Sequence, residues 1–209
     1  LEKLLVMKGH SPRAYQKVAA QMERYKMLSE AEAILKKSVL KHSDNIELGE
    51  SLARVLLNNQ KKTEAVKLLT ALANKAPKES LLRIAELLSS AEEHELTLKT
   101  LQGRYEDFSQ DRRFLNVLIT KAKLLKKFDL GIEYAMRSLD LSKTISEAEL
   151  SIGTIVTLSE LSKSQNELVK KISEQNETTS YRQWLSSELY VSLGNINEAK
   201  KILEKLQQK

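Results

Sequence analysis

A pair of short amphipathic runs recurs along this chain, and that recurrence constrains its fold more than any other feature. The clearest second run covers residues 61–77. It places apolar or small residues at helical spacing and closes on Pro77, which cannot continue a helix. The run before it, residues 45–58, carries an apolar stripe of its own. Neither helix can bury its stripe alone, so the sequence predicts that the two pack as an antiparallel hairpin.

Composition places the chain in the all-α class. Of its 209 residues, 41% are hydrophobic and 30% are charged, and only 2 are proline. This balance is too apolar for disorder, and no stretch is apolar for long enough to predict a membrane span. Alternating β-branched residues are rare, so we expect no strand longer than three residues. The chain has no cysteine, which excludes disulfides and thiolate chemistry.

The hairpin repeats at intervals of 31 to 37 residues. We align the repeats on the residue where the second helix crosses the first, which gives Ala31, Ala65, Thr97, Gly131, Leu168 and Ala199. The same reading predicts helices near residues 11–26, 28–42, 45–59, 62–75, 78–91, 93–107, 111–127, 129–142, 145–162, 165–176, 179–193 and 196–208. A period near 34 built from helical pairs is typical of helical repeat proteins.

With this period and these helical pairs, the chain resembles the tetratricopeptide repeat family. Repeat two carries the resemblance through Ala65, Leu69, Leu72 and Pro77, and repeat six carries it through Tyr190, Gly194, Ala199 and Leu203. The resemblance implies an all-α superhelical solenoid of about six helix–turn–helix hairpins, a single domain over residues 10–209. Repeats three and five depart from the pattern, because Thr97 and Leu168 replace a small alanine, and we expect their crossings to be less regular.

Residues 1–9 fit the same register. Leu1, Leu4 and Leu5 fall where a second helix would place its apolar residues, and Gly9 falls where Pro77 ends the later one. We therefore expect residues 1–9 to be the tail of a preceding repeat. The expectation that follows is a chain that forms one part of a larger assembly protein.

The sequence contains no recognised catalytic or cofactor motif. Phosphate loops, nucleophile elbows and paired metal-binding histidines are absent. His10, His42 and His94 stand at separate hairpin ends, where we expect surface residues near helix termini. The sequence predicts no enzyme activity, no cofactor and no metal site.

The net charge is +6, and its sign alternates between blocks from residue 78 onward. A nucleic-acid-binding protein more often concentrates one sign along a stripe. Arg112, Lys123, Lys126 and Lys127 do share about a third of one helical circumference. A solvated basic face explains this cluster best. Nucleic-acid or other polyanion binding through basic faces stays open as an alternative.

The resemblance implies that the first helices line a concave groove in which a peptide or protein partner binds. Carrying the family's groove positions over gives Arg13, Gln16, Glu47, Glu50, Arg54, Arg113, Asn116, Lys123, Tyr181, Trp184 and Glu188. Family members that dock chaperones hold a terminal carboxylate with lysine and asparagine across consecutive repeats. Gln16, Glu50 and Arg54 do not supply that arrangement, which argues against this kind of partner.

These observations predict a non-enzymatic protein–protein interaction scaffold that does not insert in a membrane and has no specific nucleic-acid partner. A further alternative is self-association by stacking of exposed solenoid ends, such as residues 196–209. Trp184 is expected either in the groove or in the hairpin core. A shift of one residue in the repeat register moves it from one environment to the other. We expect these leucines to be buried between hairpins: Leu52, Leu56, Leu69, Leu72, Leu118, Leu139, Leu189 and Leu203.

Overall fold

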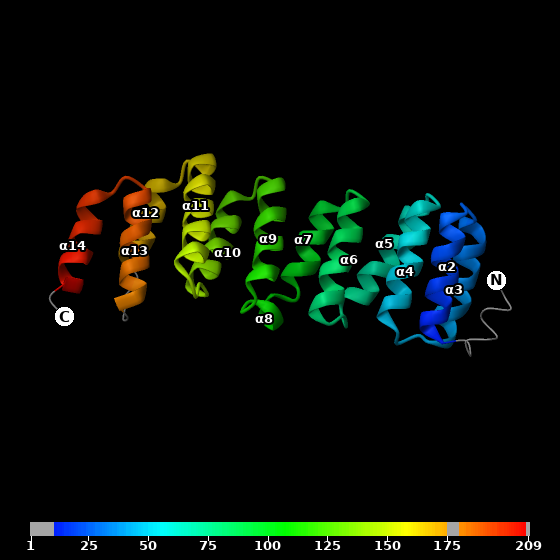
Figure 1. Ribbon diagram of the computed structural model, residues 1–209. Coiled ribbons are helices and arrows are strands. Elements are labelled where there is room, and N and C mark those ends of the chain that lie inside the picture. Colours follow the sequence, from blue (N-terminus) through cyan, green and yellow to red (C-terminus); the bar gives the residue numbers. More distant parts are fainter. Residues whose placement is uncertain (1–10, 175–179, 208–209) are drawn as a thin grey trace. The chain divides into compact units, whose positions relative to one another are not determined.

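The computed structural model describes residues 11–174 and 180–207, and within these ranges every regular element is an α-helix (Figure 1). The chain divides into two compact units, one ending at Arg104 and the other beginning at Tyr105. The predicted all-α class is confirmed. Residues 1–9, the predicted tail of a preceding repeat, lie outside the described residues. The prediction of a single domain over residues 10–209 stays a prediction.

Unit 1 contains three helical hairpins. Its helices are α2 (Pro12–Arg24), α3 (Leu28–Lys41), α4 (Ile46–Asn58), α5 (Lys62–Ala73), α6 (Lys78–Ser90) and α7 (His94–Gln102). Each first helix packs against the second helix of its own hairpin. The first helices α2, α4 and α6 also contact one another in sequence order, so one surface of the unit is built from first helices alone. We call this the first-helix surface.

Unit 2 contains a short helix followed by three further hairpins. Its helices are α8 (Tyr105–Phe108), α9 (Arg112–Leu124), α10 (Phe128–Asp140), α11 (Ile145–Ser162), α12 (Gln165–Glu174), α13 (Ser180–Ser192) and α14 (Ile196–Gln207). Within this unit α10 packs against both α9 and α11, and α11 also contacts α13. The described residues thus hold six hairpins, as the spacing of the repeats predicts.

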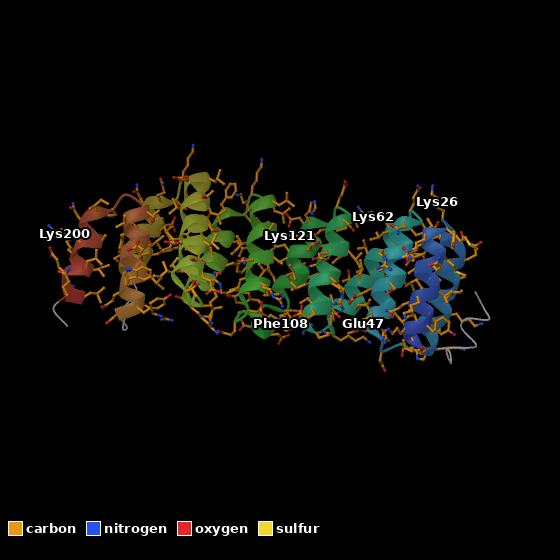
Figure 2. The ribbon with its side chains drawn as sticks, viewed as in Figure 1. Lys26, Glu47, Lys62, Phe108, Lys121 and Lys200 are labelled. Atoms are coloured by element: carbon orange, nitrogen blue, oxygen red, sulfur yellow. The ribbon has the colours of Figure 1, made fainter. Side chains whose placement is uncertain are left out.

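All six hairpins turn in the same way. Between the two helices, one residue takes a left-handed conformation, with φ between 56° and 76°. The next residue donates its backbone N–H to the carbonyl oxygen five positions earlier, at 2.8–3.0 Å, which closes a Schellman motif. The side chain of Lys26 extends from the first of these turns (Figure 2). The left-handed residues are Lys26, Gln60, Glu92, Lys126, Lys163 and Gly194.

Each left-handed residue stands five positions before the crossing residue that the sequence predicts. All six crossing residues are buried. The two hairpins whose helices contact each other least are α6/α7 and α11/α12. These are the hairpins in which Thr97 and Leu168 replace a small residue, and their second helices, α7 and α12, are also the shortest of the six. The predicted irregularity of the crossings in repeats three and five stays a prediction.

Polar side chains begin several first helices. Ser11 Oγ accepts a hydrogen bond from the Ala14 N–H at 3.3 Å, and Asn45 Oδ1 accepts one from the Leu48 N–H at 2.9 Å. At the start of α11, Thr144 Oγ1 accepts from the Glu147 N–H at 3.2 Å, and the Glu147 carboxylate accepts from the Lys143 N–H at 2.7 Å. The hydrogen bond from the Lys143 N–H lowers the pKa of Glu147. These caps satisfy N–H groups that a helix leaves unpaired at its first turn.

Seven of the eight leucines predicted in the core are buried. Leu203 is the exception, because 38% of its surface is exposed. The equivalent residue of each of the other five hairpins is at most 3% exposed: Leu35, Leu69, Leu101, Ala135 and Ile172. In the described residues no further hairpin covers α14 at this point, and the prediction of burial was wrong for that reason.

The predicted helix over residues 93–107 was also wrong, because two helices occupy this stretch. Helix α7 ends at Gln102, and α8 begins at Tyr105 after a turn at Gly103 and Arg104. The Arg104 guanidinium donates to the carbonyl oxygens of Ala73 and Ala76, at 2.9 and 3.0 Å. Arg104 thereby satisfies carbonyls near the end of α5 that a helix terminus leaves unpaired.

Candidate functional site

The first-helix surface of unit 1 contains a hollow of about 570 Å³. Four of the predicted groove residues, from two different helices, lie together there: Gln16, Glu47, Glu50 and Arg54. The rest of its lining comes from α4 and α6: Ser51, Arg83, Glu86 and Leu87. We call this the α4/α6 hollow.

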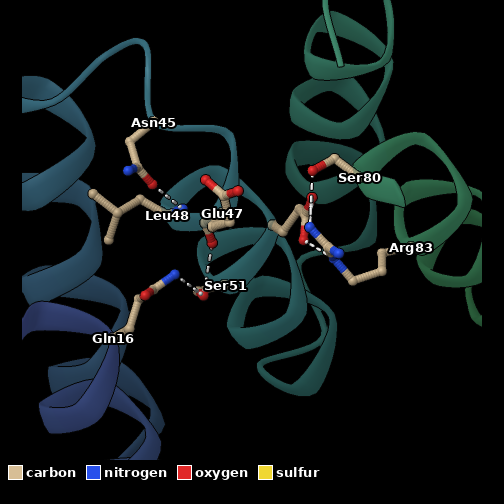
Figure 3. Close-up of polar contacts among 8 residues, drawn as sticks. Gln16, Asn45, Glu47, Leu48, Ser51, Ser80 and Arg83 are labelled. Atoms are coloured by element: carbon tan, nitrogen blue, oxygen red, sulfur yellow. Dashed lines mark hydrogen bonds and ion pairs between the residues drawn. The ribbon is translucent and has the colours of Figure 1, made fainter. Parts of the chain in front are cut away.

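The α4 wall of the hollow is positioned by hydrogen bonds that begin at its N-cap (Figure 3). Asn45 caps α4 and so places Glu47 in its first turn. Ser51, one turn later, donates its hydroxyl to the Glu47 carbonyl oxygen at 2.8 Å. Gln16 of α2 donates its side-chain amide to the Ser51 oxygen at 3.4 Å. The hollow therefore has one wall tied to the preceding hairpin.

A two-point ion pair joins the opposite walls. Arg83 Nε and Nη2 donate to the two carboxylate oxygens of Glu50, at 2.7 and 3.2 Å. Arg83 Nη2 also donates to Ser80 Oγ at 2.8 Å (Figure 3). Glu50 is only 8% exposed, and its hydrogen bonds raise the pKa of Arg83. Paired in this geometry, the two side chains hold each other in fixed positions.

Some of the charged side chains beside this ion pair have a partner of opposite charge, and others do not. Arg54 forms an ion pair with Glu23 at 3.3 Å, and Asn58 also donates to Glu23. Glu47 and Glu86 are exposed, and among the described residues neither carboxylate accepts a hydrogen bond or forms an ion pair. The α4/α6 hollow therefore presents two open carboxylates around a neutralised centre.

Other predicted groove residues lie apart from this hollow. Arg13 is exposed on α2 but does not line it. Arg83, Ser80 and Leu87 were missed by the sequence reasoning. All three belong to repeat three, which departs from the family pattern at Thr97 and supplies none of the predicted groove residues given above.

In unit 2, Arg113, Asn116 and Lys123 are exposed on α9. Only Lys123 borders a second hollow, of about 750 Å³, whose other walls come from α11. Those α11 residues, from a repeat for which no groove positions were predicted, are Ser146, Glu149, Leu150, Gly153, Thr154, Thr157 and Leu158. Leu150 is 72% exposed on this surface, and the sequence alone does not distinguish it from the buried leucines of the chain.

Tyr181 and Trp184 stack on each other on α13, with ring centroids 6.0 Å apart and an angle of 28° between the planes. The Tyr181 hydroxyl donates to the Ser142 carbonyl oxygen at 3.1 Å. Trp184 and Glu188 are half-buried. Trp184 thus occupies neither of the predicted environments completely, because one face stacks on an exposed tyrosine while the rest of the ring is partly covered.

The predicted basic cluster does not form a shared face, because Arg112 is directed into unit 2. Its guanidinium donates to the Ser138 carbonyl and the Ser142 hydroxyl, and to the Glu147 carbonyl oxygen at 3.0 Å. Arg112 therefore connects α9 to the end of α10 and the start of α11. The remaining lysines, Lys123, Lys126 and Lys127, are exposed.

The described residues contain no group of three histidine, aspartate or glutamate side chains placed to hold a metal ion. His42 packs against the ring of Tyr15 at the end of α3, and His94 begins α7. Both imidazoles are half-buried, while His10 lies outside the described residues. No helix in the described ranges combines the length and the apolar character that crossing a bilayer requires.

No family model and no curated protein sequence matches this chain. Similar solved structures include tetratricopeptide repeat proteins. One from Parabacteroides merdae is 13% identical, with 96% of this chain and 93% of that one covered and a TM-score of 0.49. YrrB, described as a TPR protein with an unusual peptide-binding site, is 12% identical, with coverage of 98% and 89% and a TM-score of 0.45. MamA from Desulfovibrio magneticus is 14% identical, with coverage of 94% and 93% and a TM-score of 0.44.

Likenesses at this level give no role to any residue of this chain. The helical-hairpin repeat rests on the chain's own helices and on the turn geometry that all six hairpins share.

Proposed function

We propose that this chain is a non-enzymatic scaffold that binds a peptide or protein partner on the first-helix surface of unit 1. The α4/α6 hollow is the observation that carries the proposal. Helical repeats provide extended surfaces of this kind, on which successive repeats each contribute a few side chains. We further propose that the chain works as one part of a larger assembly.

The chemistry of the hollow favours a partner segment with basic residues. Glu50 and Arg83 neutralise each other, so the net field of the hollow comes from Glu47 and Glu86. A lysine or arginine placed between them would form charge-assisted hydrogen bonds without displacing an internal partner. The half-buried Leu87 adds an apolar contact for the same segment.

A random dodecapeptide library displayed on phage tests this proposal. We expect peptides selected on the wild-type chain to be rich in lysine and arginine. Fluorescence anisotropy should show that Glu47→Lys/Glu86→Lys weakens their binding at least tenfold, a difference of about 1.4 kcal/mol. Glu30→Lys, the same change at an exposed site on α3, is the matched control and should leave affinity unchanged. Selected peptides without basic residues, or equal losses in both variants, would contradict the proposal.

A second candidate function is self-association through α14. Leu203, Val191 and Ile196 are 38%, 45% and 57% exposed and line a hollow of about 390 Å³. Lys200 and Glu204 border the same hollow and form an ion pair at 3.9 Å. We infer a second copy as the occupant, because an apolar patch with a lysine and a glutamate beside it is the kind of self-complementary surface that a two-fold dimer uses.

Sedimentation velocity at several concentrations tests this second candidate. We expect the sedimentation coefficient of the wild-type chain to rise with concentration and that of Leu203→Lys to stay at the monomer value. Leu40→Lys is the matched control, because Leu40 is 85% exposed on α3. A wild-type chain that stays monomeric, or a control that dissociates equally, would exclude association through α14.

A further inference from the structure

Unit 2 contains a hollow of about 430 Å³ between α10 and α12, the second helices of two successive hairpins. It is separate from the first-helix surfaces described above, since none of its lining residues belongs to α9, α11 or α13. Its volume lies within the roughly 300–1,000 Å³ of ligand sites in proteins. We call it the α10/α12 hollow.

The hollow lies beside the crossing residue of repeat five. Leu168 occupies the crossing position, where the neighbouring hairpins have Gly131 and Ala199. A bulky residue at a crossing keeps two helices from approaching closely, and α12 contacts α11 less than any other second helix contacts its first. Leu168 itself lines the hollow.

The floor of the hollow is apolar and comes equally from both helices. Ile132 and Met136 stand one turn apart on α10, and Leu168 and Ile172 stand one turn apart on α12. Ile132 and Ile172 are 8% and 3% exposed, whereas Met136 is half-buried. Two apolar pairs thus face a common space that no side chain of the described residues fills.

The rim of the hollow carries an unbalanced charge. Arg137 pairs with Asp140 at 3.9 Å, and Lys171 pairs with Glu167 at 3.5 Å. Asp129 and Glu133, one turn apart on α10, are exposed, and within the described ranges neither carboxylate forms an ion pair or accepts a hydrogen bond. The rim therefore offers two adjacent carboxylates beside the apolar floor.

We propose that the α10/α12 hollow binds an amphipathic helix of a partner protein, with an apolar stripe flanked by lysine or arginine. The lining on α10 runs from Asp129 to Asp140, which at 1.5 Å per residue is about three helical turns. A groove of that length between two helices suits a third helix whose apolar residues recur every three or four positions. Basic residues along one side of its stripe then meet Asp129 and Glu133.

Two synthetic peptides of fifteen residues test the proposal by methyl NMR. Both carry leucine at positions 4, 7, 8 and 11 of an alanine helix, and they differ only in flanking lysines or flanking glutamates. With isoleucine and methionine methyl groups labelled, we expect the lysine peptide to shift the signals of Ile132, Met136 and Ile172. Ile84, which is buried in unit 1, should not respond. The glutamate peptide should cause no shift at the same concentration.

Two variants locate the binding and make the result decisive. Asp129→Asn/Glu133→Gln removes only the rim charge and should weaken the binding of the lysine peptide at least tenfold. Met136→Trp fills the floor and should abolish the shifts at Ile132 and Ile172. Glu160→Gln, an exposed site on α11, is the matched control and should bind normally. Equal binding of the two peptides, an unchanged affinity in the rim variant, or shifts confined to other residues would overturn the proposal.

Discussion

Glu32 accepts more polar contacts than any other side chain that joins the first two hairpins. It is 5% exposed on α3, and it accepts hydrogen bonds from Lys61 Nζ and Asn59 Nδ2, both at 2.7 Å. Lys36 Nζ lies 2.8 Å away. Burial alone would raise the pKa of Glu32, but the hydrogen bonds from Lys36, Lys61 and Asn59 outweigh it and lower the pKa to about 2. Asn59 and Lys61 flank the left-handed residue of the second hairpin, so Glu32 fixes that turn against α3.

Glu32→Gln should lower the free energy of unfolding at pH 7 by about 1–3 kcal/mol. The lower end of that range reflects the lysine side chains, which are 42–46% exposed and therefore partly screened. Because the pKa is lower in the folded state than the ordinary 4.5, the stabilisation is present above about pH 5 and is lost as the pH falls toward 2. Urea melts from pH 7 to pH 2.5 measure this. A variant with the wild-type slope below pH 5 would show that Glu32 is not the group responsible.

The left-handed turn residues provide a second prediction at this scale. Five of the six are not glycine, and a side chain with positive φ is strained by about 1–2 kcal/mol. Gln60→Gly should raise the free energy of unfolding by about 0.5–1 kcal/mol after the greater chain entropy of glycine is subtracted. Gly194→Ala should lower it by a similar amount. Chemical denaturation of both variants checks the signs, and a shift in the same direction for both would refute the shared turn geometry.

At the scale of elements, local sequence signals were sufficient to predict every helix except the one expected over residues 93–107. The predicted helices match the observed bounds to within a few residues, because caps, apolar spacing and turn residues act within one or two turns of chain. The burial of all six crossing residues was predictable for the same reason. The division of residues 93–107 into two helices was not, because it depends on Arg104 reaching carbonyls about thirty residues earlier.

Alanine substitutions at two glycines in first helices should change the stability of the chain in opposite directions. A Cβ on Gly49 would stand 2.6 Å from Leu72 Cδ1 of α5, whereas a Cβ on Gly153 meets nothing within 4 Å. Gly49→Ala should therefore destabilise the chain by about 1–2 kcal/mol, since the forced shift of a buried leucine exceeds the gain in helix propensity. Gly153→Ala should stabilise it by about 0.5–1 kcal/mol. Thermal melts decide this, and a stabilised Gly49→Ala would show that α4 and α5 do not approach this closely.

At the scale of the whole molecule, the sequence predicted which residues share the first-helix surface. It did not predict which side chains those residues pair with. Gln16, Glu47, Glu50 and Arg54 do lie together. The pairing of Glu50 with Arg83 and the internal position of Arg112 depend on side-chain directions between hairpins. A repeat register that is uncertain by one residue does not contain that information.

Nucleic-acid binding is expected to be weak for this charge distribution. Arg112 is engaged internally, and the exposed lysines at and just after the end of α9 leave only scattered phosphate contacts. We expect the affinity for a 20-base-pair duplex to be micromolar or weaker and to fall steeply between 50 and 200 mM salt. Fluorescence anisotropy with a labelled duplex measures both. Nanomolar binding that persists at 200 mM salt would favour the polyanion-binding alternative.

Site-specific photo-crosslinking tests most directly whether partners bind on the first-helix surface of unit 1. A benzophenone amino acid replaces Leu87 in the α4/α6 hollow or, as the control, Ala71 on the exposed side of α5. After irradiation with a peptide selected from the phage library, mass spectrometry identifies the crosslinked position. We predict covalent capture from the Leu87 position and none from the Ala71 position. Capture from Ala71 alone, or equally from both, would contradict binding on this surface.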